Sequence, residues 1–267
     1  IKGGTKMLKE KLEFTEEKAV YFLESENEKF GPFDEVQNSF NGFITKVQIE
    51  NGYKFGYVDA ERGEIIPPTY EGFIPEYDYQ KHEIAGFIFV QNLQLGYIDR
   101  DGKQIIPAKY YSIGRVKGGF TVGQIDEELE SQQKEEPLYD WEKETHINMG
   151  FCDENGQETI PCLYYAVKKV LDYYIIQKEE NGKLGLFDLQ GNQILPFEFE
   201  DIQPTNVVVA AKQGGQYGLY SPEGELLLPC EYKSIKNYGQ DYELTKPDGS
   251  KQYCDKTGKI IEDIERE

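Results

Sequence analysis

A short pattern that recurs along the chain constrains its fold more than any other feature. The clearest copy, GYIDRDGKQIIPAKY, runs from Gly96 to Tyr110. Further copies begin at Gly56, Gly150, Gly185 and Gly218, and a weaker one begins at Gln252. The last three intervals between these positions are close to 34 residues, whereas the first two are 40 and 54 residues. Repetition at such a period indicates one small structural unit per copy, stacked in tandem.

Each copy contains a turn. An Asp or Ser precedes a glycine by three residues, as in Asp99 and Gly102. The Asp side chain can accept a backbone N–H two residues on, and glycine takes the positive φ that closes a hairpin. The turn glycines are Gly63, Gly102, Gly156, Gly191, Gly224 and Gly258. In the first copy, Asp59 and Gly63 are four residues apart, so that turn holds one inserted residue.

The returning strand is short and apolar and meets a proline, such as Pro107. Because proline has no N–H to donate, the strand must end there or lie at a sheet edge. Three residues later comes an aromatic residue, which we expect to anchor the core: Tyr70, Tyr110, Tyr164, Phe199 and Tyr232. A third strand then leads to the next copy. Each copy is therefore predicted to be a three-stranded antiparallel meander of about 34 residues, without a helix.

These units predict an all-β fold. A closed, propeller-like array is favoured because the chain starts part-way through a unit and its last copy lacks the proline and the aromatic residue, so the two ends could complete one unit. An open β superhelix is the alternative. Residues 1–19 carry a weakly helical pattern and are predicted to be an N-terminal extension. Residues 20–267 are predicted to form a single repeat domain.

Composition excludes several partners. The net charge is −20 and no run of Lys or Arg stands out, which argues against nucleic acid. No apolar run approaches the roughly 18 residues that span a membrane. Cys152, Cys162, Cys230 and Cys254 occupy repeated positions, so we expect buried, unpaired thiols. Unpaired thiols lean towards a cytoplasmic location, but the compartment stays open.

One segment breaks the pattern. Residues 124–148 are acidic and contain Trp141, the one tryptophan of the chain. They form either a solvated loop or a contact loop in which Tyr139 and Trp141 bind a partner.

The sequence offers little chemistry. Neither His82 nor His146 has metal-ligand spacing around it, and no nucleotide-binding or hydrolase motif is present. We therefore predict no catalytic residues, no metal site and no cofactor. Paired carboxylates of the glycosidase type stay open, because one sequence cannot position them.

The pattern from Gly96 to Asp99, with Gly102, Pro107 and Tyr110, resembles the WG-repeat (KWG-repeat) family of bacterial proteins. The tryptophan that names the family is absent, and its slot holds Phe55, Leu95, Met149, Leu184, Tyr217 and Lys251. The resemblance implies an accessory or surface-associated repeat module without catalytic residues; the family also includes secreted proteins. We expect a non-catalytic scaffold that binds a protein. A carbohydrate-binding module is the alternative, because the 20 Tyr and 15 Phe could stack on glycans. A glycoside-acting enzyme comes third.

Overall fold

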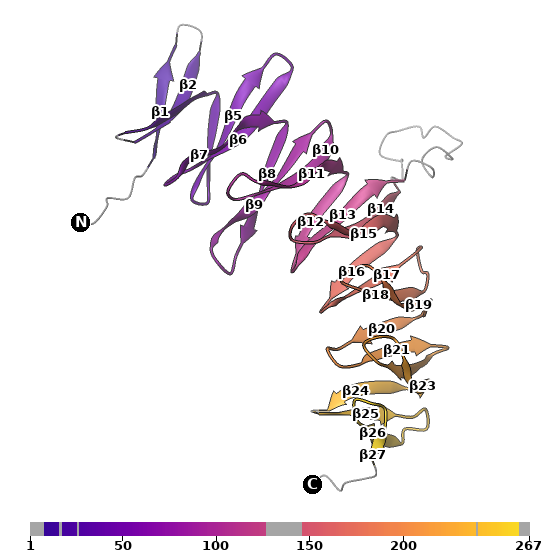
Figure 1. Ribbon diagram of the computed structural model, residues 1–267. Coiled ribbons are helices and arrows are strands. Elements are labelled where there is room, and N and C mark those ends of the chain that lie inside the picture. The colour runs from indigo at the N-terminus through magenta and orange to yellow at the C-terminus, as the bar shows by residue number, and fades with distance from the viewer. Residues whose placement is uncertain (1–7, 16–17, 26, 127–145, 239, 262–267) are drawn as a thin grey trace, which may run out of the picture. The chain divides into compact units, whose positions relative to one another are not determined.

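The computed structural model describes residues 8–15, 18–25, 27–126, 146–238 and 240–261 (Figure 1). All regular secondary structure in this part of the chain is β-strand, which confirms the all-β prediction.

The strands form antiparallel sheets, each of which pairs strands that are neighbours in sequence. The first sheet has three strands, β1 (Lys9–Phe14), β2 (Ala19–Glu24) and β3 (Lys29–Phe33). Two four-stranded sheets follow. One holds β4 (Glu35–Ser39), β5 (Gly42–Ile49), β6 (Gly52–Asp59) and β7 (Gly63–Tyr70). The other holds β8 (Gly72–Asp78), β9 (Glu83–Gln91), β10 (Gln94–Asp99) and β11 (Gln104–Tyr110).

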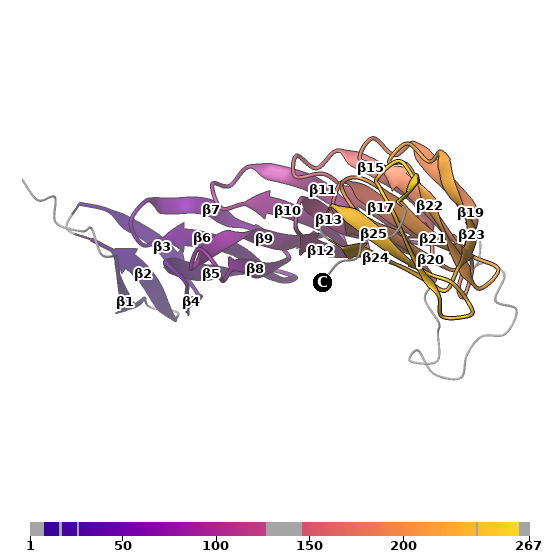
Figure 2. The ribbon, with the colours of Figure 1, turned by 90° about the horizontal axis from the view of Figure 1, so that it is seen from below.

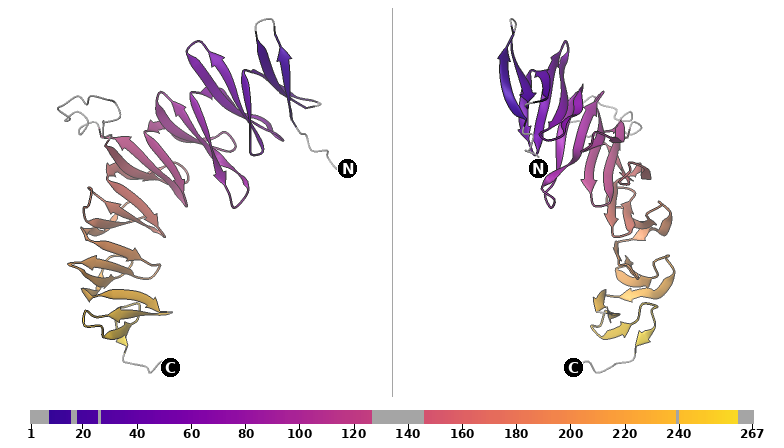
Figure 3. Two further views of the ribbon diagram at one scale, coloured as in Figure 1. Left: turned by 180° about the vertical axis from the view of Figure 1, so that it is seen from behind. Right: turned by 60° about the vertical axis from the view of Figure 1, so that its left-hand side comes forward.

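Four more four-stranded sheets follow in chain order. The first and second of these hold β12 (Ser112–Val116), β13 (Gly119–Ile125), β14 (Ile147–Cys152) and β15 (Glu158–Tyr164), and then β16 (Ala166–Val170), β17 (Tyr173–Gln177), β18 (Leu184–Asp188) and β19 (Gln193–Phe199). The third holds β20 (Asp201–Pro204), β21 (Val209–Gln213), β22 (Gln216–Tyr220) and β23 (Leu226–Tyr232). The fourth holds β24 (Ser234–Tyr238), β25 (Asp241–Thr245), β26 (Lys251–Cys254) and β27 (Ile260–Ile261). The strands of each sheet are drawn as one group in Figure 3, and Figure 2 shows the same ribbon from below.

The chain divides into two compact units. Unit 1 holds residues 1–120 and 154–157, and unit 2 holds residues 121–153 and 158–267. The single domain over residues 20–267 stays a prediction, as does the choice between a closed and an open array.

The three-stranded meander is wrong, because a fourth strand follows each anchor aromatic. β8 begins two residues after Tyr70, and β12 begins two residues after Tyr110. Two of these strands, β12 and β24, are five residues long and carry mainly polar or half-exposed side chains, so they lack the apolar run that marked the other strands. A sheet therefore joins the second half of one sequence copy to the first half of the next.

The weakly helical pattern in residues 1–19 does not lead to a helix over Lys9–Phe14. This segment is β1, which pairs with β2 from Lys9 opposite Glu24 to Phe14 opposite Ala19. Pairing with a neighbouring strand has overridden a weak local preference. The partner strand β2 follows from Ala19 to Glu24.

The proline does not end the return strand. It lies inside a strand at the edge of the sheet, which is the second of the two predicted alternatives. β11 contains Pro107 and is an edge strand. Leu95 lies opposite Tyr110 and Tyr97 opposite Ile106, so β11 has extra residues at a bulge around the proline. The leading glycine is required here, since a Cβ on Gly96 would lie 2.7 Å from the Ile106 carbonyl oxygen.

The turns have the predicted chemistry. All six turn glycines have φ between +78° and +90°. Asp99 Oδ1 accepts backbone N–H groups from Asp101 at 3.0 Å and Lys103 at 2.9 Å. In unit 2 the turn glycines also press on the preceding sheet, because a Cβ on Gly191 would lie 2.4 Å from the Thr159 carbonyl oxygen. Glycine is thus needed for both conformation and docking.

The anchor aromatics lie at the core or beside it. Tyr110, Phe199 and Tyr232 are buried. Tyr70 and Tyr164 are half-buried against Phe89 and Phe197, with ring centroids 4.4 Å and 6.1 Å away. The four cysteines form no disulfide, and three of them are buried, whereas Cys230 is half-buried.

Within the described ranges, no helix is long and apolar enough to cross a membrane.

Candidate functional site

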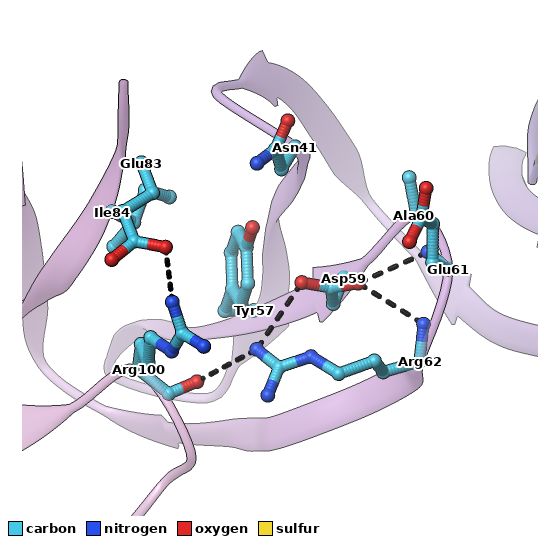
Figure 4. Close-up of a pocket in the computed structure, with 9 residues that line it drawn as sticks. All are labelled: Asn41, Tyr57, Asp59, Ala60, Glu61, Arg62, Glu83, Ile84 and Arg100. Atoms are coloured by element: carbon cyan, nitrogen blue, oxygen red, sulfur yellow. Dashed lines mark hydrogen bonds and ion pairs between the residues drawn. The ribbon is translucent and has the colours of Figure 1, made fainter. Parts of the chain in front are cut away.

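A pocket of about 500 Å³ lies in unit 1, where turns and strand ends of the β4–β7 sheet meet those of the β8–β11 sheet (Figure 4). It is lined by Asn41, Tyr57, Asp59, Ala60, Glu61, Arg62, Glu83, Ile84 and Arg100.

Two departures from the repeat meet at this pocket. The first is the inserted residue between Asp59 and Gly63, in the turn that carries Arg62. The second is a longer β8–β9 hairpin. Gly42 pairs with Asp59 and Gly86 pairs with Asp99, so the two glycines are equivalent; β5 begins at Gly42, whereas β9 begins earlier, at Glu83. The extension supplies Glu83 and Ile84 to the pocket wall.

Both irregularities leave a trace in the sequence. The interval of 40 residues between Gly56 and Gly96 exceeds the later intervals near 34, and the surplus falls in the β8–β9 hairpin. The interval and the inserted residue are visible in the sequence, but the pattern did not predict Arg62, Glu83 or Arg100 as site residues. A repeat can tolerate local insertions on one face, where they build binding surface.

The two arginines of the pocket are already paired. Arg62 Nη2 donates to Asp59 Oδ2 at 3.2 Å and to the Arg100 carbonyl oxygen at 3.1 Å, and its Nη1 pairs with Asp101. Arg100 pairs with Glu83. Burial tends to lower the pKa of Arg62, but the hydrogen bonds to Asp101 and Asp59 outweigh it and raise that pKa. Both guanidinium groups are therefore held in place and largely neutralised.

Asp59 and Tyr57 form the floor of the pocket. Asp59 is 8% exposed, and its Oδ1 accepts the backbone N–H groups of Glu61 and Arg62, each at 3.0 Å. Tyr57 donates its hydroxyl to the Phe40 carbonyl oxygen at 3.1 Å. Burial raises the pKa of Tyr57, and the nearby Asp59 raises it further, so the phenol stays neutral. Figure 4 shows Tyr57 standing between the Glu83–Arg100 pair and Asp59.

We call three exposed aromatic residues, Phe40, Tyr77 and Tyr79, the aromatic trio: the first two are neighbours of pocket-lining residues in the sequence or across a strand pair, and Tyr79 is a neighbour of Tyr77. Phe40 precedes Asn41 of the pocket lining, and Tyr77 pairs with Ile84 of the same lining. The Phe40 and Tyr77 rings are 6.2 Å apart edge to face, and Tyr77 and Tyr79 are also 6.2 Å apart. The exposed fractions are 44% for Phe40, 37% for Tyr77 and 82% for Tyr79.

Smaller pockets occur at related positions. One of about 280 Å³ in unit 1 is lined by Tyr97, Asp99, Arg115 and Phe120, among others. The Tyr97 hydroxyl is buried and has no hydrogen-bond partner among the described residues, and burial raises the pKa of Tyr97 to about 12. Another, of about 270 Å³ in unit 2, has a mainly uncharged lining that includes Leu219 and Tyr242.

The described carboxyl groups whose pKa is shifted all shift in one direction. Wherever the pKa of a described carboxyl group departs from its ordinary value, it is lowered; in Glu243, for example, a hydrogen bond from Lys251 lowers it. Groups of three His, Cys, Asp or Glu side chains able to hold a metal ion are absent from the same residues. Tyr139 and Trp141, the predicted contact residues, lie outside the described ranges.

No curated protein matches the chain. Solved structures to which the chain is similar include three that span several kinds of protein. The WD40 β-propeller domain of Doa1 is 10% identical (84% of this chain and 75% of that chain, TM-score 0.26). Hsv2 of Kluyveromyces lactis is 9% identical (81% and 70%, TM-score 0.29). AztD of Citrobacter koseri is 9% identical (91% and 78%, TM-score 0.28). Overlaps at these TM-scores carry no argument about fold or function.

A family model described as "WG containing repeat" matches residues 96–126, 185–206 and 217–242. Each matched stretch begins at or beside a leading glycine of the pattern, namely Gly96, Gly185 and Gly218. These three stretches therefore match the WG-containing repeat, which confirms the resemblance predicted from the pattern.

Proposed function

We propose that the chain is a non-catalytic binding module that holds a protein partner at the unit 1 pocket and the aromatic trio. The observation that carries this proposal is the meeting of two departures from the repeat, the inserted turn residue and the longer β8–β9 hairpin, at one pocket. A feature that serves only to stack repeats would be common to all units, whereas a feature present at one place serves that place.

The residue types support a protein partner. Tyr and Arg dominate the binding energy of protein interfaces, and they act best where neighbouring groups hold them in place. Arg62 and Arg100 are fixed by ion pairs, and Tyr77 is fixed by a hydrogen bond of 3.2 Å with the Ser39 hydroxyl. Such a surface loses little side-chain freedom on binding.

A pull-down with a matched pair of variants tests the proposal. Tyr79 is 82% exposed, so Tyr79→Ala leaves the core intact, and Tyr165→Ala in unit 2 is the control, since Tyr165 is 48% exposed. With tagged full-length chain and extract of the source cells, Tyr79→Ala should reduce capture of a specific partner by about tenfold, as expected for loss of an interface anchor. The proposal is wrong if Tyr79→Ala and Tyr165→Ala both capture the same proteins as the parent chain.

A carbohydrate ligand is the second candidate. Sugar sites combine an aromatic platform with a few polar groups in a concave site, and here Tyr79 is exposed and the pocket lining includes Asn41, Glu61 and Arg100. Binding to a glycan array that is lost in Tyr79→Ala would favour this candidate over a protein partner. A glycoside-acting enzyme is the third candidate, for which hydrolysis of a glycan substrate would be the evidence.

We also propose how the repeats are arranged: units of about 34 residues form a closed, propeller-like array, and an open superhelix is the alternative. Small-angle X-ray scattering of the full chain distinguishes them, because an open array has the larger radius of gyration. The contact loop with Tyr139 and Trp141 remains a further possible part of the partner surface, and Trp141→Ala in the same pull-down tests it.

A further inference from the structure

We propose that the unit 1 pocket receives a cationic side chain, an arginine or a lysine, of the partner protein. This inference rests on the proposed function and specifies which chemistry the pocket recognises.

The charge of the pocket favours a cation. Three carboxylates line it, Asp59, Glu61 and Glu83, against the two arginines Arg62 and Arg100. A fourth carboxylate, Asp101, also pairs with Arg62. Both arginines are therefore engaged with carboxylates of the chain itself and offer little attraction to an anion.

Glu61 is the carboxylate left for a ligand. Its backbone N–H is fixed by Asp59 Oδ1 at 3.0 Å, so the start of the side chain is held at the pocket. The side chain is exposed and has no ion-pair or hydrogen-bond partner in the part of the chain that the structure describes. An incoming ammonium or guanidinium group can pair with it without breaking an existing contact, and a charge-assisted hydrogen bond is stronger than a neutral one.

The aromatic trio adds a second kind of attraction for a cation. The faces of exposed Tyr and Phe rings attract cations electrostatically, and the attraction grows as the cation loses water. The chain already uses this contact internally, since Lys46 Nζ lies 4.1 Å from the centroid of the Tyr53 ring. The proposal places the cationic group at Glu61 and the stem of its side chain along the exposed rings of Tyr77 and Tyr79. A neutral ligand would gain only the ring contacts.

The overall charge acts in the same direction. With a net charge of −20, the chain attracts basic segments and repels acidic ones, and this raises association rates at low salt. The two smaller pockets have different linings. The pocket at Leu219 has no carboxylate in its lining, and the pocket at Tyr97 is lined by Asp99 and Glu154 together with Arg115.

An NMR titration of the ¹⁵N-labelled full chain tests the inference. The probes are N-acetyl-arginine amide and N-acetyl-citrulline amide, which have nearly the same shape but differ in charge. The arginine probe should shift the backbone signals of Glu61, Tyr77 and Tyr79, and the citrulline probe should shift them at least threefold less at equal concentration. Glu61→Gln should reduce the response to arginine at least threefold, whereas Glu180→Gln, an exposed position of unit 2, should leave it unchanged.

Equal responses to the two probes, or an unchanged response in Glu61→Gln, would overturn the inference. No binding of the arginine probe would also overturn it. These results are separable from the pull-down: if Tyr79→Ala loses the partner while arginine does not bind, the proposed function stands and the cation specificity is wrong. If arginine binds while Tyr79→Ala keeps every partner, the pocket has the predicted chemistry but is not the partner site.

Discussion

Replacing Gly191 by alanine should show how tightly neighbouring sheets are docked. Gly191 closes the β18–β19 turn with φ +83°, and its N–H donates to the Asp188 carbonyl oxygen at 3.1 Å. A Cβ at this position would lie 2.4 Å from the Thr159 carbonyl oxygen on β15. Since real Cβ atoms do not approach a backbone oxygen so closely, the turn or the neighbouring strand must move.

Gly249 provides the control. It closes the β25–β26 turn with φ +86°, and a Cβ there would have no atom within 4 Å. Alanine in the left-handed region costs about 1–2 kcal/mol at either position. Overpacking adds about 1–3 kcal/mol at Gly191 alone. Gly191→Ala should therefore lower the free energy of unfolding by about 2–5 kcal/mol in total, and Gly249→Ala by about 1–2 kcal/mol.

Urea denaturation followed by circular dichroism measures both variants, with the free energy taken from the midpoint and the slope. The informative quantity is the difference between the two variants, because the φ cost is common to both and cancels. Equal losses of stability would mean that docking of the turn against β15 contributes nothing, and the role assigned to the repeated glycine would then reduce to turn conformation.

Further predictions concern unit 1. Tyr57→Phe removes a hydrogen bond to the Phe40 carbonyl oxygen and should lower the free energy of unfolding by about 0.5–1.5 kcal/mol. Tyr97→Phe removes a hydroxyl without a described partner and should leave that free energy unchanged or raise it. Thermal unfolding of the two variants measures the difference. Two backbone N–H groups of the β8–β9 turn donate to Asp78 Oδ1 at 3.1 Å and lower its pKa below 3.8. Because the folded pKa is depressed, this contribution is complete above pH 3.8 and is lost as the pH falls through the lowered pKa, which an NMR titration of Asp78 would follow. Asp78→Asn should remove that acid-induced change; an unshifted Asp78 pKa would contradict the assignment.

The sequence determined the local structure of each unit. Asp99 and Gly102 have the turn geometry expected from their spacing, because an Asp at the start of a turn and a glycine at positive φ act within a few residues of each other. The missing N–H of Pro107 left two alternatives, the end of a strand or the edge of a sheet, and the structure has the edge. The strands starting at Ser112 and Ser234 could not be predicted, because their side chains are mostly polar or half-exposed and their conformation is fixed by pairing with β13 and β25.

Only the tertiary structure decided where the irregular residues meet. The inserted residue beside Arg62 and the long interval before Gly96 are visible in the sequence, but Arg62 and Asp101 are 39 residues apart along the chain. Their ion pair exists because adjacent sheets bring successive turns side by side. The pocket that Asp59 and Glu83 line forms for the same reason. Spacing along the chain fixes hydrogen bonds within a turn, whereas contacts between turns depend on how one sheet packs on the next.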